Sequence, residues 1–416
     1  MRDADIDKAN AEALTRITAA TPYLVDLRPA GEVIPGLGER EFLHAGPPLE
    51  GWREACGALR GAIVGTIVRA GLAQDLGSAE AMAASDAIRL TPAHDRDALG
   101  TFAAPIGART PVFVVENRAA GTRAFAAINE GRGKALRYGS TDAQTLERVA
   151  WLETGFAATL RKAILATGGI DLFDIVSQAL HMGDDGHSRQ KASSALFLAA
   201  VGPAIAESGS PPEETARALR FLAQNDFFFL PLAMAAAKSA MLAAADVHGS
   251  TLVTAMAFNG VRCGIRVGGT GGRWWAAPVP AIQGQYFQSY GARDAGPVIG
   301  DSEITETIGL GAFAMAGAPA LARYVGGTIE QAVRFSSEMY KVTAAEHPRF
   351  TIPALGFRGT PLGIDARKVV ATGIEPVFNT GIAHRSPSVG QIGAGYGRAP
   401  IAAFQAALEA MPAGPG

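Results

Sequence analysis

Cysteine is scarce in this sequence of 416 residues: Cys56 and Cys263 are its two cysteines, and they lie far apart. Neither a disulfide framework nor the Cys/His spacing of a structural zinc site is therefore present, and a reducing compartment fits. An excess of one charge is also lacking, because 37 basic residues balance 39 acidic ones without a long run of either sign. This balance argues against nucleic acid or an anionic membrane surface as the main partner.

The sequence also lacks an obvious export or membrane signal. Residues 1–7 are acidic and contain no apolar segment of the kind found in a secretory signal peptide. The longest apolar run, residues 227–245, could span a bilayer by length, but Pro231, Lys238 and Ser239 interrupt it. We interpret it as a helix buried in a large core, and we expect a soluble, cytoplasmic protein.

Several common catalytic motifs are missing. Residues 131–134, Gly-Arg-Gly-Lys, lack the spacing and the hydroxyl residue of a phosphate-binding P-loop. No G-x-S-x-G or H-E-x-x-H segment occurs, and no strand-helix-strand pattern surrounds the glycines at 393–397. The common ATPases, serine hydrolases, zinc proteases and Rossmann dehydrogenases are therefore disfavoured.

Glycine, in contrast, is abundant. The chain has 50 glycines, about 12% of its residues against a usual value of about 7%. They gather in the second half without a fixed period, as expected where loops approach a small molecule closely. Helical spacing dominates residues 141–245, and short β-like runs lie on either side of them, which predicts an α+β fold.

Changes in this pattern along the chain suggest a multi-domain protein. We predict a mixed α/β domain over residues 1–140, a helical domain over 141–248 and a glycine-rich α+β domain over 249–416. The local patterns predict strands at 23–27, 112–115, 350–353 and 377–379, and helices at 52–73 and 329–346. The last five residues are expected to be disordered.

The polar turn from His181 to Arg189 is the first candidate for chemistry. His181 and His187 could move protons, and Asp184 could act with them or help to hold a divalent metal. Arg189 could bind a carboxylate or a phosphate through a bidentate fork. The structural alternative is a turn between helices in which Asp184 or Asp185 caps the next helix.

A glycine-rich turn around Gly269, Thr270 and Gly271 is the second candidate. Its backbone N–H groups could form a nest for an anion, with the Thr270 hydroxyl beside them. A flexible hairpin is the structural alternative.

The third candidate is the segment Gly-Asp-Ser-Glu-Ile-Thr-Glu-Thr at residues 300–307. Ser302, Thr305 and Thr307 could line an oxyanion or phosphate at a helix N-terminus. Glu306 could act as a base or hold a metal. An ordinary capping box at a helix start is the structural alternative.

Two weaker sets combine asparagine, histidine and arginine. One contains Asn117 and Arg118, and the other contains Asn379, His384 and Arg385 ahead of further glycines. Surface loops often have this composition. Together with the stronger candidates, these sets suggest a site for a small, polar, anionic substrate.

At these residues the sequence resembles the AllG/YlbE family of bacterial proteins. Matching runs include Gln-Ala-Leu-His-Met-Gly-Asp at 178–184, Gly-Asp-Ser-x-Ile-Thr-Glu-Thr at 300–307 and Asn-Thr-Gly-Ile-Ala-His-Arg at 379–385. With further runs at 26–36, 44–48, 114–118 and 357–365, the resemblance covers nearly the whole chain.

The resemblance implies an activity and partners. The activity assigned to the family is oxamate carbamoyltransferase, in which oxalurate and phosphate give oxamate and carbamoyl phosphate during ureide and purine-nitrogen breakdown. Such proteins are usually encoded beside FdrA-like (AllF) and AllH-like subunits, which implies an oligomeric complex. Phosphate is then a co-substrate, no cofactor is certain, and a divalent metal is left open. An α+β fold with a helical subdomain is expected.

Three functions follow from the residues and the resemblance. The first is a carbamoyltransferase subunit in which His181 or His187 moves a proton to or from the leaving amide nitrogen. The second is a stand-alone amidohydrolase acting on a related ureide, and the third is a non-catalytic scaffold beside an FdrA-like chain. Ser188 and Phe258 stand where the family usually has Asn and Arg, so contact of these positions with substrate would indicate a different ureide or amide.

Overall fold

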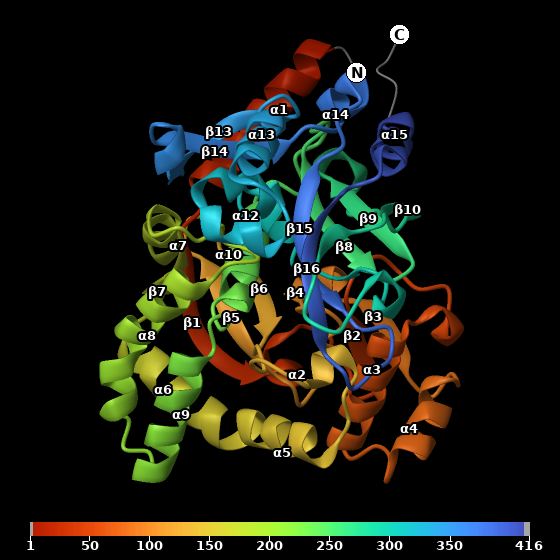
Figure 1. The fold of residues 1–416 in the computed structure, drawn as a ribbon, viewed down its shortest axis with the longest axis vertical. Coiled ribbons are helices and arrows are strands. Elements are labelled where there is room, and N and C mark those ends of the chain that lie inside the picture. Colours follow the sequence, from red (N-terminus) through yellow and green to blue (C-terminus); the bar gives the residue numbers. More distant parts are fainter. Residues whose placement is uncertain (1–2, 412–416) are drawn as a thin grey trace.

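The computed structural model describes residues 3–411, and the C-terminal residues expected to be disordered, 412–416, lie outside that range. Helices and strands occur in unequal blocks, and the strands form several small sheets. The α+β class predicted from the sequence is thereby confirmed. Figure 1 shows helices α6 to α9 along one side of the molecule, strands β8 to β10 along the other, and β15 and β16 between them.

A mixed five-stranded sheet has the order β4-β6-β5-β1-β7. Its strands are β1 (Pro22–Pro29), β4 (Ala98–Leu99), β5 (Pro111–Asn117), β6 (Thr122–Ala127) and β7 (Ile170–Asp171). β4 runs parallel to β6, and the other neighbouring pairs are antiparallel. β1 and β5 confirm the strands predicted at 23–27 and 112–115, where apolar side chains are buried.

The middle of the chain is helical almost throughout, as predicted. Its helices are α5 (Ala143–Trp151), α6 (Ala157–Ala166), α7 (Leu172–His181), α8 (Lys191–Ala206), α9 (Pro212–Gln224) and α10 (Leu230–Leu242). A π-helical turn, Leu152–Phe156, joins α5 to α6. α10 is buried along nearly all of its length against β5 and β6, which confirms the interpretation of residues 227–245. Across residues 3–411, no helix combines the length and apolarity needed to cross a membrane.

The remaining strands form four small sheets within the described residues. One has the order β10-β9-β8-β12, formed by β8 (Val253–Asn259), β9 (Arg262–Val267), β10 (Trp275–Pro278) and β12 (Ile299–Gly300). Another has the order β11-β16-β15, formed by β11 (Gln283–Tyr286), β15 (Val377–Ala383) and β16 (Gln391–Arg398). The two-stranded sheets are β13 (Thr343–Ile352) with β14 (Arg358–Ile364), and β2 (Glu41–His44) with β3 (Arg89–Pro92). β13 and β15 overlap the strands predicted at 350–353 and 377–379.

Two helices predicted from the sequence have different bounds. The helix expected at 329–346 is α13 (Ile329–Met339), because residues from Thr343 onward pair with β14 instead. The helix expected at 52–73 is a 3-10 turn, Trp52–Glu54, followed by α3 (Gly57–Arg69). The other helices are α1 (Asp3–Thr18), α2 (Ala30–Val33), α4 (Leu76–Ala83), α11 (Ile304–Thr307), α12 (Pro319–Tyr324), α14 (Ala366–Thr372) and α15 (Ile401–Glu409).

The buried apolar side chains form several clusters. One of them surrounds α10 and draws residues from α1, β1 and β5, from the helices of the middle region, and from α11 and β14. It therefore joins all three regions predicted from the sequence, whose division into domains stays a prediction. A second cluster lies among β8, β9, α13, α14 and α15.

Candidate functional site

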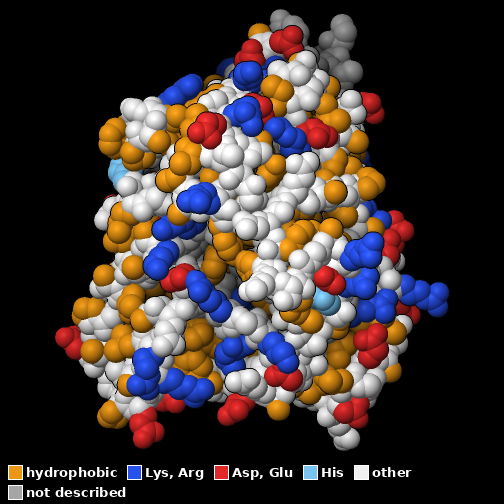
Figure 2. All heavy atoms as spheres, in the orientation of Figure 1, with side chains coloured by type: hydrophobic (Ala, Val, Ile, Leu, Met, Phe, Trp, Pro, Cys, Tyr) orange, Lys and Arg blue, Asp and Glu red, His pale blue; other side chains and the backbone are white. Residues whose placement is uncertain are grey.

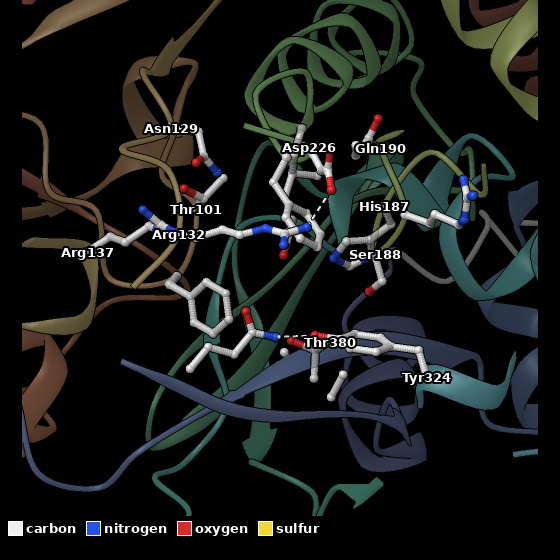
Figure 3. A pocket seen from close by; sticks show the side chains of 18 of the residues that line it. Thr101, Asn129, Arg132, Arg137, His187, Ser188, Gln190, Asp226, Tyr324 and Thr380 are labelled. Atoms are coloured by element: carbon white, nitrogen blue, oxygen red, sulfur yellow. Dashed lines mark hydrogen bonds and ion pairs between the residues drawn. The ribbon is translucent and has the colours of Figure 1, made fainter. Parts of the chain in front are cut away.

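A cavity of about 500 Å³ lies where loops from all three regions meet, a size that suits a small ligand. Its wall comes from the loops after β4 and β6, the connection between α7 and α8, helix α12 and the β15–β16 hairpin. Figure 2 shows a hollow on one face of the molecule with Lys and Arg side chains around it. In the close view, Arg137, Asn129 and Thr101 lie on one side and His187 and Ser188 on the other (Figure 3).

His187 and Glu306 form a buried pair at the cavity wall. His187 comes from the α7–α8 connection and lines the cavity, and Glu306 belongs to the one-turn helix α11. The His187 Nδ1 atom lies 2.9 Å and 3.1 Å from the two carboxylate oxygens of Glu306. The His187 Nε2 atom makes no hydrogen bond to any described residue, so it is the ring nitrogen left to meet a ligand.

The charges around His187 favour its protonated form. Burial by itself lowers the pKa of this imidazole, but the Glu306 carboxylate, assisted by Glu303 and Asp185, raises it to about 9. Burial also raises the pKa of Glu303 to about 8, against the lowering effect of His187. At neutral pH the charges around His187 therefore hold its ring as an imidazolium ion, which can donate a proton.

The Glu306 carboxylate is fixed from several directions. Its Oε2 lies 3.0 Å from the Thr305 hydroxyl oxygen, and its Oε1 accepts a hydrogen bond from the Ala312 N–H at 3.2 Å. Gly311 has a φ of 64°, and a Cβ atom at this position would lie 2.1 Å from Glu306 Oε1. Both the backbone conformation and the place of the carboxylate therefore require glycine at 311.

Asp185 shapes the loop that presents His187. Its Oδ1 accepts hydrogen bonds from the backbone N–H groups of His187 at 3.0 Å and Arg189 at 2.8 Å. Its Oδ2 accepts a bond from Asn379 Nδ2 at 2.7 Å, and Asn379 in turn accepts one from the Ser188 hydroxyl. Asn379, predicted to bind substrate, thus lies behind the cavity wall and holds the loop in place.

Asp184 lies at the start of helix α8. Its Oδ2 accepts hydrogen bonds from the Ser193 N–H at 2.8 Å and the Ser193 hydroxyl at 3.0 Å, and its Oδ1 accepts one from Arg189 Nη1 at 2.6 Å. Burial raises the pKa of this carboxyl group. These contacts match the helix-capping alternative, because both carboxylate oxygens are engaged within the protein. Arg189 lines the cavity, but it already has this carboxylate partner.

Asp301 joins two glycine-containing loops next to Ser302. Its Oδ1 accepts a hydrogen bond from the Gly46 N–H at 2.8 Å, and its Oδ2 accepts one from the Gly100 N–H at 2.9 Å. Burial raises the pKa of Asp301 to about 7 in spite of these bonds. The loop that follows Gly100 carries Phe102, which lines the cavity with a φ of 53°. Asp301 therefore holds the loop after Gly100, which contributes to the cavity wall, and also the loop at Gly46, which does not line the cavity.

The turn formed by Gly269, Thr270 and Gly271 does not line the cavity. The Gly269 N–H donates to the Ser250 carbonyl at 2.9 Å, and the Thr270 hydroxyl donates to the Val267 carbonyl at 2.7 Å. The Gly269 N–H and the Thr270 hydroxyl are therefore engaged within the fold, at a turn that lies outside the cavity wall.

Among the hydroxyl residues of the third candidate, Ser302 lines the cavity and Thr305 and Thr307 do not. The Thr305 hydroxyl donates to the Ser302 carbonyl at 2.8 Å, and the Thr307 hydroxyl donates to the Ile304 carbonyl at 2.6 Å. Because α11 is a single helical turn and both threonines are bonded within it, its N-terminus does not form the predicted phosphate site.

Five further residues singled out in the sequence do not line the cavity: His181, Asn117, Arg118, His384 and Arg385. His181 is exposed, and its Nε2 lies 2.7 Å from the hydroxyl of Thr351. Arg118 lies over the ring of Tyr23, with its guanidinium carbon 3.8 Å from the ring centroid. Both side chains therefore have partners at other parts of the fold.

The remaining three of these residues also lie outside the cavity wall. Asn117 is buried, and its Oδ1 accepts hydrogen bonds from the N–H groups of Thr21 and Ala119. His384 Nδ1 accepts one from the Ser386 N–H, and Arg385 is exposed. Within residues 3–411, no group of three His, Cys, Asp or Glu side chains has the arrangement of a metal site.

Several polar cavity residues were not found from the sequence: Thr101, Asn129, Arg132, Arg137, Tyr138 and Tyr324. Arg132 lies in the Gly-Arg-Gly-Lys segment, whose composition we used against a P-loop. Arg137 precedes an aromatic residue and a glycine, which was a weak signal for a cavity residue.

Comparison with known proteins identifies the family. The family model described as oxamate carbamoyltransferase subunit AllG matches residues 88–302, about half of the chain. A protein of Escherichia coli strain K12 with the same description is 41% identical over 98% of this chain and 97% of its own length. The chain belongs to the AllG family. The resemblance stated from the sequence motifs is therefore confirmed.

Two further relatives of this AllG-family chain are similar over most of their length. The uncharacterized protein YahG of the same E. coli strain is 42% identical over 97% of this chain and 85% of its own length. A crystal structure of a conserved protein of unknown function from Enterococcus faecalis V583 superposes with a TM-score of 0.96 at 42% identity, covering 98% of this chain and 97% of that chain. The fold is thus shared by an experimentally determined relative.

Proposed function

We propose that this chain is a catalytic subunit of an oxamate carbamoyltransferase, in which phosphate and oxalurate give carbamoyl phosphate and oxamate. The AllG relative carries this description as a subunit, which supports a role within such an enzyme. The observation that carries the catalytic part of the proposal is the His187–Glu306 pair at the wall of a ligand-sized cavity.

The reaction needs a proton donor and stabilisation of anionic groups. A phosphate oxygen attacks the carbamoyl carbon, the bond from that carbon to the oxamate nitrogen breaks, and the nitrogen takes up a proton. The imidazolium of His187 supplies that proton from Nε2, the proton that the attacking hydrogen phosphate loses restores the imidazolium, and the Glu306 carboxylate stabilises the positive charge of the ring before transfer. In the reverse direction the neutral imidazole takes the proton back.

Partner chains belong to the same proposal. Because the relative is a subunit, we propose FdrA-like and AllH-like chains as partners of this one, in the cytoplasm. A small ureide anion would bind in the cavity with phosphate beside it.

The test uses the purified chain, alone and with those partner chains, supplied with oxalurate and phosphate. The proposal expects phosphate-dependent release of oxamate and carbamoyl phosphate that His187→Gln greatly reduces. Turnover that does not need phosphate would favour the amidohydrolase alternative. Turnover that requires the partners and is unaffected by His187→Gln would favour the scaffold alternative.

A further inference from the structure

Arg137 is a buried arginine whose charge has no carboxylate partner among the described residues. It lies in the 3-10 turn Leu136–Tyr138, is 5% exposed and lines the cavity. Its Nη2 donates to the Gly131 carbonyl at 2.6 Å, and its guanidinium carbon lies 4.5 Å from the centroid of the Tyr138 ring. These contacts fix the plane of the group but leave its positive charge uncompensated.

The other two cavity arginines differ from Arg137. Arg132 forms an ion pair with Asp226, and Arg189 forms one with Asp184. The carboxylate nearest to Arg137 in sequence, Glu130, instead accepts hydrogen bonds from the backbone N–H groups of Leu136 at 2.7 Å and Arg137 at 2.9 Å. An unpaired charge that is this deeply buried is costly, so its presence in a cavity indicates an anionic ligand.

Neutral donors without protein partners surround this charge. Asn129 Nδ2 and the Thr101 hydroxyl donate no hydrogen bond within residues 3–411, and neither do Nε and Nη1 of the Arg137 guanidinium itself. Figure 3 shows Arg137, Asn129 and Thr101 on the same side of the cavity. One fixed positive charge with neutral donors suits a monoanionic carboxylate better than a phosphate dianion.

Two aromatic rings adjoin this group of donors. The rings of Phe102 and Tyr138 are 4.8 Å apart at an interplanar angle of 65°, and both residues line the cavity. A planar oxo-amide can lie against such rings while its carboxylate meets the guanidinium.

We propose that Arg137, with Asn129 and Thr101, binds the carboxylate of the oxamate moiety, a subsite that rests on the proposed function. The carboxylate end of the substrate then lies on the Arg137 side of the cavity, and its carbamoyl end extends toward His187 on the opposite side. Arg137 thereby fixes the direction in which the ureide lies.

The test is calorimetric titration of the full-length chain with oxamate, and separately with inorganic phosphate, near pH 7.5. Arg137→Gln should weaken oxamate binding by at least about tenfold, Arg137→Lys should recover part of it, and phosphate binding should change little. Arg358→Gln is the matched control, because Arg358 also lies over a tyrosine ring, 3.5 Å from the centroid of Tyr340, outside the cavity. Thermal unfolding of each variant establishes that it is folded, and Arg137→Lys carries the test should Arg137→Gln not fold.

Three results would overturn the subsite. They are unchanged oxamate affinity in the Arg137 variants, absence of oxamate binding by the unsubstituted chain, or loss of phosphate affinity in place of oxamate affinity. Failure of the proposed function is distinguishable, because it would appear as Arg137-dependent oxamate binding by a chain that supports no phosphate-dependent turnover.

Discussion

His187 Nδ1 lies 2.9 Å from Glu306 Oε1 although 119 positions separate the two residues in sequence. The first belongs to the turn before α8, and the second belongs to the one-turn helix after β12. Their contact joins two segments that the sequence presents as separate candidates. It also fixes the charge of the imidazole, because the carboxylate stabilises the protonated ring within a buried site.

Replacing Glu306 by Gln should shift the pH dependence of turnover. In the unsubstituted chain the pKa of His187 is raised to about 9, so the proton donor persists through neutral pH and is lost as the pH rises through that value. Without the carboxylate, burial lowers the pKa of the ring, and the descending limb of the profile should move to lower pH. The rate at pH 7.5 should fall about 10- to 100-fold. The measurement is kcat against pH for the partner-reconstituted enzyme, and an unmoved descending limb would contradict the assignment.

Gly311→Ala should reproduce part of the effect of Glu306→Gln, although it replaces neither His187 nor Glu306. An added Cβ would lie 2.1 Å from Glu306 Oε1, so the carboxylate must move away from its present position. We expect a loss of turnover of at least about tenfold and a descending limb at lower pH, as for Glu306→Gln.

Gly373→Ala is the matched control for this substitution. Gly373 has a φ of 68°, close to the 64° of Gly311, but a Cβ atom there would have no neighbour within 4 Å. Both variants should lose about 1 to 2 kcal/mol of unfolding free energy from the backbone conformation alone. Equal turnover in the two variants would show that displacement of Glu306 has no catalytic consequence.

Asp301→Asn should destabilise the protein by about 1 to 3 kcal/mol, measured by urea unfolding. Each carboxylate oxygen of Asp301 accepts a backbone N–H, from Gly46 and from Gly100. An amide has a single acceptor oxygen, so one of these buried N–H groups must lose its bond. Asp75→Asn, at the exposed N-cap of α4, is the comparison and should cost less, because water can replace the bond lost from the Ser78 N–H. An equal cost at both sites would argue against this role of Asp301.

Glu303→Gln should make the free energy of unfolding less dependent on pH. The pKa of Glu303 is raised by burial to about 8 from an ordinary 4.5, so the folded state holds a proton that the unfolded state releases between these values. The stability that this group contributes is present below pH 4.5 and is lost as the pH rises through 8. Glutamine resembles the protonated acid and should remove that slope. Urea unfolding at pH 5, 6.5 and 8 tests this, and parallel curves for both proteins would contradict it.

Local patterns in the sequence predicted much of the fold because they depend on burial over short stretches. The apolar runs of β5 and α10 indicated buried elements correctly. The C-terminal end of the helix expected at 329–346 was wrong, because pairing of Thr343 with Ile364 in β14 places those residues in a strand. That contact lies outside any local window.

The residues of the candidate site also divide into those that local sequence patterns predicted and those that they did not. His187, Ser302 and Glu306 were found because polar residues that are dense in sequence also gather in space. Arg137 was missed because its distinguishing property is a charge without a carboxylate partner, which depends on how Gly131 and Tyr138 surround it. The first histidine of the polar turn, His181, was selected only because it is near in sequence to the others.

The two histidines of that turn should therefore behave differently when each is replaced by Gln. His187 lines the cavity with Nε2 unbonded among the described residues, so His187→Gln removes the proton donor and should lower kcat about 10²- to 10⁴-fold. His181 ends α7 on the surface, where its ring contacts Thr351 and lies 5.5 Å from the ring of Phe357. His181→Gln should therefore keep kcat and KM within about twofold, since a surface substitution away from the cavity leaves transition-state contacts unchanged. Steady-state kinetics of both variants with partner chains present decides between the histidines. A large loss of kcat in His181→Gln with normal thermal stability would indicate that His181 is the proton donor. The assignment of this role to the His187–Glu306 pair would then be wrong.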